Sequence, residues 1–145
     1  MLLATPEETE RFGRAIAQQL RPGDVLALFG DLGAGKTTLT RGILRGLGFE
    51  GDVASPTFPI VQPYEALELP VWHVDLYRIE HSSELAELAL DEALDDGALV
   101  IEWPERLGDA LWPHALRLHL TARADGVRAL TVQVPPAWGE RWPPS

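Results

Sequence analysis

The most informative absence in this sequence is cysteine. None of the 145 residues is a cysteine, which excludes a disulfide framework, a thiolate zinc site and a cysteine nucleophile. The four histidines do not show the HExxH spacing of a zinc protease. No apolar run approaches the about 20 residues that cross a bilayer, and the acidic start does not resemble a signal peptide. We therefore expect a cytoplasmic protein with no membrane segment.

Basic residues are also scarce relative to acidic ones. The chain has 12 lysines and arginines against 22 aspartates and glutamates, so its net charge is −10. This balance argues against a broad basic surface that would neutralise the phosphates of a nucleic acid. We expect any role that involves nucleic acid to be indirect.

The composition that remains is that of an ordinary globular chain. Hydrophobic residues make up 46% of it and charged residues 23%, which is typical of a folded domain rather than a disordered one. The length predicts one domain, residues 1–134. Residues 135–145 form a tail rich in proline and tryptophan, which we expect to be poorly ordered unless its two tryptophans dock on the body.

Hydrophobic spacing predicts alternating helices and strands. Thr5, Pro6 and Glu8 combine three helix-start signals, so a helix should run from there to Pro22. A second helix should follow residue 36 and end at Gly48, and a third should span the following segment. This third helix is expected over residues 82–94, and its inward side chains would be Leu85, Leu88 and Leu94.

Strands are predicted from two kinds of apolar pattern. Residues 25–29 are apolar without alternation, as in a parallel strand that is covered on both faces. Residues 71–76 are expected to form a second strand and residues 98–101 a third, buried one. Residues 116–120 and 130–134 alternate with period two around Asp125 and Gly126, which predicts an antiparallel hairpin. Residues 51–63 carry three prolines and are expected to be loop or irregular edge structure.

A glycine-rich motif lies between the first strand and the second helix. It fits the pattern G-x-x-x-x-G-K-[ST], in which backbone N–H groups and a helix N-terminus hold phosphate. Its residues are Gly30, Asp31, Leu32, Gly33, Ala34, Gly35, Lys36 and Thr37. Lys36 is the only lysine among the 12 basic residues, and it would reach the outer phosphates while Thr37 holds magnesium. The motif and its context predict an α/β, P-loop NTPase-like three-layer fold, with a mostly parallel central sheet, flanking helices and the C-terminal hairpin.

The nucleotide base is partly readable from another absence. The Asn-Lys-x-Asp element that reads guanine needs an asparagine and a second lysine, and the chain has neither. ATP is therefore favoured over GTP.

Two carboxylates end predicted strands and are candidates for the metal site. Asp75 and Glu102 each follow an apolar run, and ligands of an open parallel sheet bind beyond the carboxyl ends of its strands. We assign Asp75 to magnesium, directly or through water, and Glu102 to magnesium or to the attacking water, a division that could be reversed. Taken alone, each is as well explained as a solvated carboxylate.

Three further residues have open alternatives. Thr57, in the segment Ser55-Pro56-Thr57-Phe58, would sense the outer phosphate as a nucleotide switch does, or would cap a proline turn. His73 is a weak metal candidate, because a histidine in an apolar strand is more often a packed, hydrogen-bonded core residue. Arg78 would bind a phosphate or a partner carboxylate, or lie on the surface.

The combined motifs resemble one family, TsaE, the small bacterial ATPases required to make threonylcarbamoyladenosine in tRNA. The matching segments are residues 30–38, Ser55-Pro56-Thr57-Phe58, His73-Val74-Asp75-Leu76-Tyr77-Arg78 and Ile101-Glu102-Trp103-Pro104-Glu105. The resemblance extends from Thr9 to the hairpin, and it assigns no motif to the tail. It implies a magnesium-dependent ATPase, slow without partners, that acts with TsaD-like and TsaB-like proteins and meets tRNA only indirectly.

The resemblance also implies roles for single residues. Lys36, Asp75 and Glu102 would be catalytic, and Thr37, Asp75 and Glu102 would hold the metal. Trp103 would lie beside the nucleotide and Thr9 would approach the adenine. The full set expected to bind nucleotide is Thr9, Asp31, Leu32, Gly33, Ala34, Gly35, Lys36, Thr37, Thr38, Thr57 and Trp103.

Two other functions remain open from the residues. A small-molecule kinase shares the phosphate loop, although no segment clearly supplies the arginine-bearing lid that such enzymes use. A nucleotide-gated binding module would bind ATP without turnover of its own, and only its partner would respond.

Overall fold

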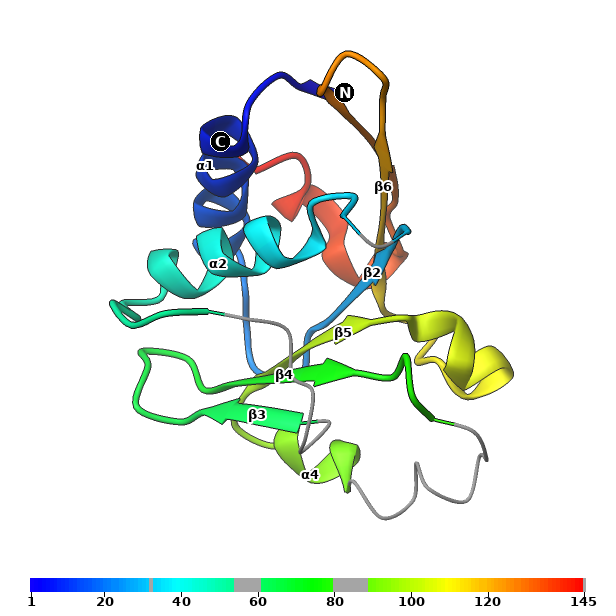
Figure 1. The fold of residues 1–145 in the computed structure, drawn as a ribbon. Coiled ribbons are helices and arrows are strands. Elements are labelled where there is room, and N and C mark those ends of the chain that lie inside the picture. The colour runs from blue at the N-terminus through cyan, green and yellow to red at the C-terminus, as the bar shows by residue number, and fades with distance from the viewer. Residues whose placement is uncertain (32, 54–60, 80–88, 145) are drawn as a thin grey trace.

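The computed structural model describes residues 1–31, 33–53, 61–79 and 89–144. Its elements follow in chain order as β1 Leu2–Leu3, α1 Pro6–Ala17, β2 Val25–Phe29, α2 Lys36–Gly46, β3 Val61–Tyr64, β4 Val71–Asp75, α4 Leu90–Ala93, β5 Ala98–Glu102, the 3-10 helix η1 Pro104–Ala110, β6 Leu116–Ala122, β7 Arg128–Gln133 and the 3-10 helix η2 Pro136–Arg141. Figure 1 shows their arrangement along the chain. None of the helices in these ranges is long and apolar enough to cross a membrane.

The strands form a single sheet in the order β1-β7-β6-β2-β5-β4-β3. The four central strands, β6, β2, β5 and β4, are parallel to one another, and the pairs β1–β7, β6–β7 and β3–β4 are antiparallel. The sheet is therefore mixed: its four central strands are parallel, as predicted, and antiparallel strands lie towards its edges. The sequence does not predict the two outermost strands, because β1 is too short to leave a signal and β3 carries Pro63, which fits only an edge strand.

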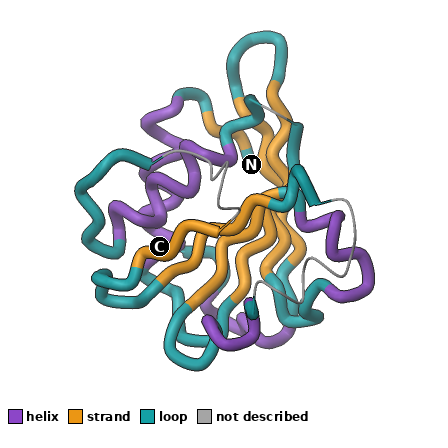
Figure 2. The backbone as a smooth tube through the Cα atoms, turned by 60° about the horizontal axis from the view of Figure 1, so that its bottom comes forward, coloured by secondary structure: helices purple, strands orange, loops and turns teal. Residues whose placement is uncertain are grey.

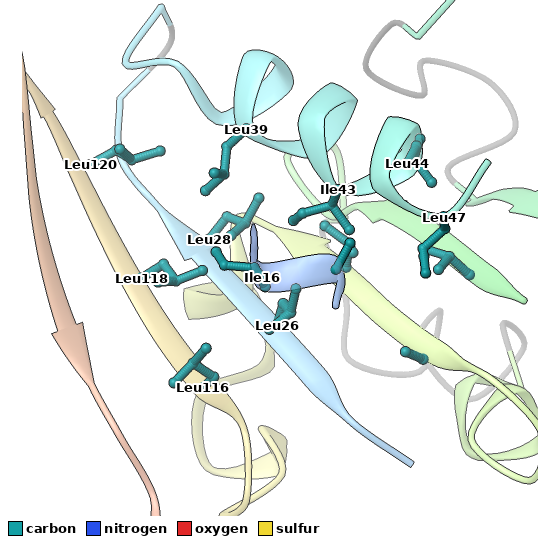
Figure 3. Close-up of a cluster of buried hydrophobic side chains, with 14 of the residues drawn as sticks. Ile16, Leu26, Leu28, Leu39, Ile43, Leu44, Leu47, Leu116, Leu118 and Leu120 are labelled. Carbon is teal, nitrogen blue, oxygen red and sulfur yellow. The ribbon is translucent and has the colours of Figure 1, made fainter. Parts of the chain in front are cut away.

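Helices cover both faces of the sheet (Figures 1 and 2). Alternate residues of β2 point to opposite faces, so Leu26 and Leu28 pack in the cluster beneath α1 and α2, and Val25 and Ala27 in the cluster on the other face. Figure 3 shows the first cluster, where α2 side chains meet those of β2 and β6. Burial on both faces explains why this strand is apolar without alternation, as predicted.

Helices α1 and α2 touch along their backbones. A Cβ atom added at Gly42 would collide with the main chain of Glu10, and one added at Gly13 would collide with the main chain of Leu39. The two glycines thus allow a closer approach of the helices than side chains would permit. The first helix is therefore held directly against the helix that begins at Lys36.

The predicted helix starts and stops are mostly confirmed. The Thr5 side chain accepts from Glu8 N–H while the Glu8 carboxylate accepts from Thr5 N–H, which makes the expected capping box. Gly48 ends α2 with a φ of 101°, a backbone conformation that favours glycine. Helix α1 nevertheless stops at Ala17, before the expected Pro22, because the next residues form tighter turns.

Two expectations fall partly or wholly outside the described residues. Of the helix predicted over residues 82–94, the structure describes only α4, and Leu94 is its half-buried C-cap. Leu85 and Leu88 lie outside the described residues, as do Thr57 and Leu32. The hairpin, in contrast, is confirmed as β6 and β7 around Gly126, which has a φ of 85°.

The C-terminal tail packs against the body, so the docked alternative for its two tryptophans is the one observed. Trp138 is buried, and the Trp142 ring meets the Phe12 ring of α1 edge-on at 5.7 Å. The Arg141 guanidinium binds the Asp24 carboxylate at 2.7 and 3.1 Å and lies over the Trp138 ring. Aromatic burial and a paired charge together anchor the tail.

Candidate functional site

A glycine-rich loop follows β2 and leads into α2. Gly30 has a φ of 150°, and a Cβ there would collide with the Leu120 carbonyl oxygen, so only glycine fits. Gly35 is the N-cap of α2 in the left-handed region, and no side chain caps the helix. The first N–H groups of α2 therefore have no side-chain acceptor from a cap, which is the arrangement that binds anions at helix N-termini.

Lys36 is buried at the first position of α2. Its side chain is 4% exposed, and within the described residues its Nζ atom makes no hydrogen bond. The ammonium instead lies 3.9 Å from the centre of the Trp103 ring. Burial lowers the pKa of Lys36, while the nearby carboxylates raise it, Glu102 and Asp75 the most. A buried ammonium with unused donors is suited to an anionic ligand.

Trp103 reaches Lys36 through an unusual backbone turn. Its φ of 58° and ψ of 48° are rare for a bulky side chain. This turn connects the end of β5 to η1, and the ring of Tyr77 leans against the indole at a centroid distance of 4.9 Å. Trp103, in this strained conformation, thus connects Glu102 to the start of η1 and places its ring against the Lys36 ammonium.

The two predicted carboxylates lie side by side at the ends of neighbouring strands. Asp75 ends β4, Glu102 ends β5, and the two residues are paired in the parallel ladder. The Asp75 carboxylate accepts from Tyr77 N–H at 2.9 Å. Burial raises the pKa of Asp75, and the Glu102 charge adds to the rise, while the Tyr77 N–H, His73 and Lys36 oppose it. The parallel pairing of β4 and β5 therefore places two carboxylates next to each other, near the Lys36 ammonium at the start of α2.

His73 has a defined partner in this cluster. Its Nε2 atom lies 2.6 Å from Oε2 of Glu102, and both side chains are buried. The structure thus agrees with the packed, hydrogen-bonded alternative. Its Nδ1 atom has no hydrogen-bond partner among the described residues. The sequence could not identify Glu102 as the partner, because the contact depends on β4 and β5 being neighbours.

A cavity of about 200 Å³ opens beside the loop. It is lined by loop and helix residues together with one carboxylate and one arginine: Gly33, Gly35, Lys36, Thr37, Thr38, Glu102 and Arg128. Thr37 and Glu102 therefore face one space with the Lys36 side chain. Arg128 comes from β7, and the sequence did not single it out.

Two further cavities border the loop. One of about 40 Å³ is lined by Thr5, Pro6, Thr9, Gly35, Thr38, Gly126 and Arg128. Thr9 is almost fully buried there, and its hydroxyl donates to the Thr5 carbonyl oxygen at 3.4 Å. The other, of about 230 Å³, is lined by Phe29, Gly30, Asp31, Ala34, His119, Leu120, Thr121 and Ala122. The described residues predicted to bind nucleotide, except Trp103, thus line one or more of three cavities around the loop.

The donor set at this end of the sheet fits magnesium. Thr37, Asp75 and Glu102 supply hydroxyl and carboxylate oxygens, which Mg²⁺ prefers, and the metal usually keeps several waters and phosphate oxygens as ligands. Among the described residues no group of three or more histidines, cysteines, aspartates or glutamates could hold a metal alone. A magnesium site that is completed by phosphate oxygens is consistent with these protein oxygen donors and with the absence of a larger cluster among the described residues.

Comparisons with known proteins identify the family. The family described as threonylcarbamoyl adenosine biosynthesis protein TsaE matches residues 3–130. The tRNA threonylcarbamoyladenosine biosynthesis protein TsaE of Streptomyces coelicolor is 44% identical over 137 residues, 90% of each chain. That of Bacillus subtilis is 42% identical and covers 87% of this chain and 79% of its own. The crystal structure of YdiB from Bacillus subtilis superposes with a TM-score of 0.81 at 34% identity, covering 95% of this chain and 86% of that one. The chain belongs to the TsaE family.

Proposed function

We propose that this protein is a magnesium-dependent ATPase that serves the biosynthesis of threonylcarbamoyladenosine in tRNA. The names of its relatives give the pathway. The observation that carries the enzymatic part is the buried Lys36 ammonium, which has no hydrogen-bond partner in the described residues and lies at an uncapped helix N-terminus after a glycine-rich loop. The strand, glycine-rich loop and uncapped helix start support the assignment of this unit as a P-loop.

In the proposed mechanism the chain mainly positions and neutralises phosphate groups. The N–H groups at the start of α2 would bind the phosphates, and the Lys36 ammonium would leave the Trp103 ring to bind the outer ones. Thr37 and Asp75 would hold magnesium, with Glu102 near enough to contribute, and the ion would neutralise developing charge on the phosphates.

Hydrolysis would break the bond between the γ-phosphorus and the oxygen that bridges it to the β-phosphate, while a water oxygen forms the new bond. Glu102 would orient that water by accepting its hydrogen bond, and His73 holds the carboxylate at 2.6 Å in the meantime. Trp103 and Tyr77 would shield the reacting groups from bulk water. The products would be ADP and inorganic phosphate.

We propose that the partners are TsaD-like and TsaB-like proteins, with tRNA met only through them. The net charge of −10 supports the indirect contact with tRNA, because a strongly acidic chain repels a phosphate backbone. Tyr77, which is 45% exposed and touches Trp103, offers a surface through which a partner would sense the nucleotide.

The test is ATP turnover with and without the partner proteins, with tRNA modification measured in the same reaction. Wild type should hydrolyse ATP faster when the partners are present, and Lys36→Ala should lose both turnover and modification. Transfer of labelled γ-phosphate to a small acceptor, with none released to water, would instead identify a kinase. Tight ATP binding without turnover, even with the partners, would identify a nucleotide-gated binding module.

A further inference from the structure

Arg128 contacts the loop from the side opposite to Trp103. It is the first residue of β7, and Nη2 donates to the Gly33 carbonyl oxygen at 3.2 Å, while Nη1 donates to that of Gly126 at 3.0 Å. Its stem passes over Gly35, where an added Cβ would lie 3.6 to 3.7 Å from Nε, Cδ and Cγ. Trp103 follows β5 and Arg128 begins β7, and these strands lie on either side of β2 in the sheet. The loop thus has the contact between Lys36 and Trp103 on one flank and the Arg128 guanidinium on the other.

Arg128 also separates two of the cavities. Gly35, Thr38 and Arg128 line both the 200 Å³ cavity that contains Lys36 and Glu102 and the 40 Å³ cavity that contains Thr9. A ligand whose phosphates occupy the first cavity and whose remainder extends past Thr38 must pass the guanidinium. In a nucleotide placed in this way, the phosphate at this boundary would be the one attached to the nucleoside.

The charges of the site call for this second cation. Carboxylates of Glu102, Asp75, Glu105 and Asp31 all act on Lys36. A bound nucleotide adds further negative charge to the same region. Of the described residues that line the larger cavity, Lys36 and Arg128 are the basic ones. A guanidinium has five N–H donors, so Arg128 can keep its two carbonyl contacts and still donate to a phosphate.

We infer that Arg128 is a nucleotide-binding residue that donates to the phosphate nearest the nucleoside, on the opposite flank of the loop from Lys36. The inference rests on the proposed ATPase function and adds to it a residue from the C-terminal hairpin. Because ATP and ADP share this phosphate, Arg128 should contribute equally to the binding of both.

The experiment compares Arg128→Met with Arg123→Met by calorimetry with ATP and ADP in the presence of magnesium. Methionine retains an unbranched stem over Gly35 but removes the donors. Arg123 is the matched control because it lies in the same hairpin, pairs with the exposed Asp125 at 3.1 Å and does not line the cavities near the loop. Arg128→Met should weaken both nucleotides by at least about tenfold, as expected for a lost charge-assisted hydrogen bond, and Arg123→Met should weaken neither.

A second measurement separates direct contact from support of the loop. Wild type should discriminate between the two diastereomers of adenosine 5′-(α-thio)triphosphate, and Arg128→Met should lose most of that discrimination. Arg128→Lys retains a cation, so it should bind both nucleotides more tightly than Arg128→Met. If Arg128→Met does not fold, the discrimination between the diastereomers is measured in Arg128→Lys instead.

Each contrary result overturns the inference in a distinct way. Unchanged affinities would show that Arg128 only joins the hairpin to the loop. Weaker ATP with unchanged ADP would place its contact on the γ-phosphate. Weaker binding of both nucleotides with unchanged discrimination would show action through the loop backbone. Wild-type protein that binds neither nucleotide would refute the proposed function itself, and the inference with it.

Discussion

Two cations in this molecule lie over tryptophan rings, and they have opposite hydrogen-bond environments. Arg141 lies 4.2 Å from the Trp138 ring, and its terminal nitrogens donate to the Asp24 carboxylate and to main-chain oxygens. Lys36 lies 3.9 Å from the Trp103 ring, and within the described ranges its ammonium donates to nothing. The same aromatic contact thus occurs once with a paired cation and once with an unpaired one.

The difference separates a structural cation from one that can bind a ligand. The Arg141–Asp24 pair, with side chains only 10% and 8% exposed, gains most of its hydrogen bonds within the folded chain. Lys36 is buried, but within the described residues its ammonium donates no hydrogen bond that would offset the loss of hydration. An anion that enters the cavity can accept these hydrogen bonds. The predictions below test this division, from the largest expected effect to the smallest.

Removing the unpaired cation should abolish function without harming the fold. Lys36→Met should lower ATP turnover about 1,000-fold, since the loss of a group that stabilises transition-state charge costs 10² to 10³ or more. Its free energy of unfolding should stay the same or rise, because a buried ammonium is replaced by an apolar chain of similar length. ATP turnover and urea denaturation of the same preparation check the two expectations. A clear loss of stability in Lys36→Met would contradict the view that Lys36 serves ligand binding and not the fold.

Removing the paired cation should have the reverse effect. Arg141→Met should lower the free energy of unfolding by about 3 kcal/mol, because it leaves the buried Asp24 carboxylate without its partner. ATP affinity should stay within about twofold at a temperature where the variant is folded, a margin well below the tenfold loss of one charged hydrogen bond. Arg14→Met is the control, since its pairing with Glu10 is exposed and should matter little. Loss of ATP affinity in Arg141→Met would show that the tail supports the site.

The histidine behind Glu102 should affect catalysis more than binding. His73→Gln should lower kcat for ATP about tenfold and leave KM nearly unchanged, because the Glu102 carboxylate loses the contact that orients it. Glu102→Gln is the reference variant and should be slower still. Equal losses in kcat and in nucleotide affinity would indicate that His73 supports the whole site instead.

Asp75 should make a small, pH-dependent contribution to stability. Its pKa is raised above the ordinary value of 3.8, chiefly by burial, so folding favours the protonated form. The stability that this preference provides is complete below pH 3.8 and is lost as the pH rises through the folded-state pKa. Asp75→Asn should therefore gain stability relative to wild type between that pH and neutrality, as urea denaturation would measure. Asp52→Asn, at an exposed position, should show no such gain. A difference in stability between Asp75→Asn and wild type that stays constant across this pH range would contradict the assignment of the effect to the Asp75 carboxyl.

Local signals indicate those parts of the candidate site that depend on neighbouring residues. Glycine spacing and apolar runs act over short distances, so they indicate the loop, Lys36 and the strand-terminal carboxylates, whose roles stay predictions. Arg128 could not be found in this way. It reaches Gly33 across a sequence separation of 95 residues, and the hairpin pattern alone does not say which strand the hairpin joins.

The fold shows the same limit. The central strands followed from their apolar character, whereas β1 and β3 pair at the two edges of the sheet and have no such pattern. The tail appeared disordered from its prolines, yet Trp138 and the Asp24–Arg141 pair anchor it. Neither partner of that pair has a local pattern that indicates the other.

The backbone contact between α1 and α2 has a mechanical consequence. Because Gly13 and Gly42 leave no room between the two backbones, a displacement of α2 towards α1 would push α1 with it. The Trp142 ring, seated on Phe12 of α1, would move with them. A displacement of α2 by a ligand would therefore reach the tail, where Trp142 fluorescence would record it in a variant that lacks the other four tryptophans.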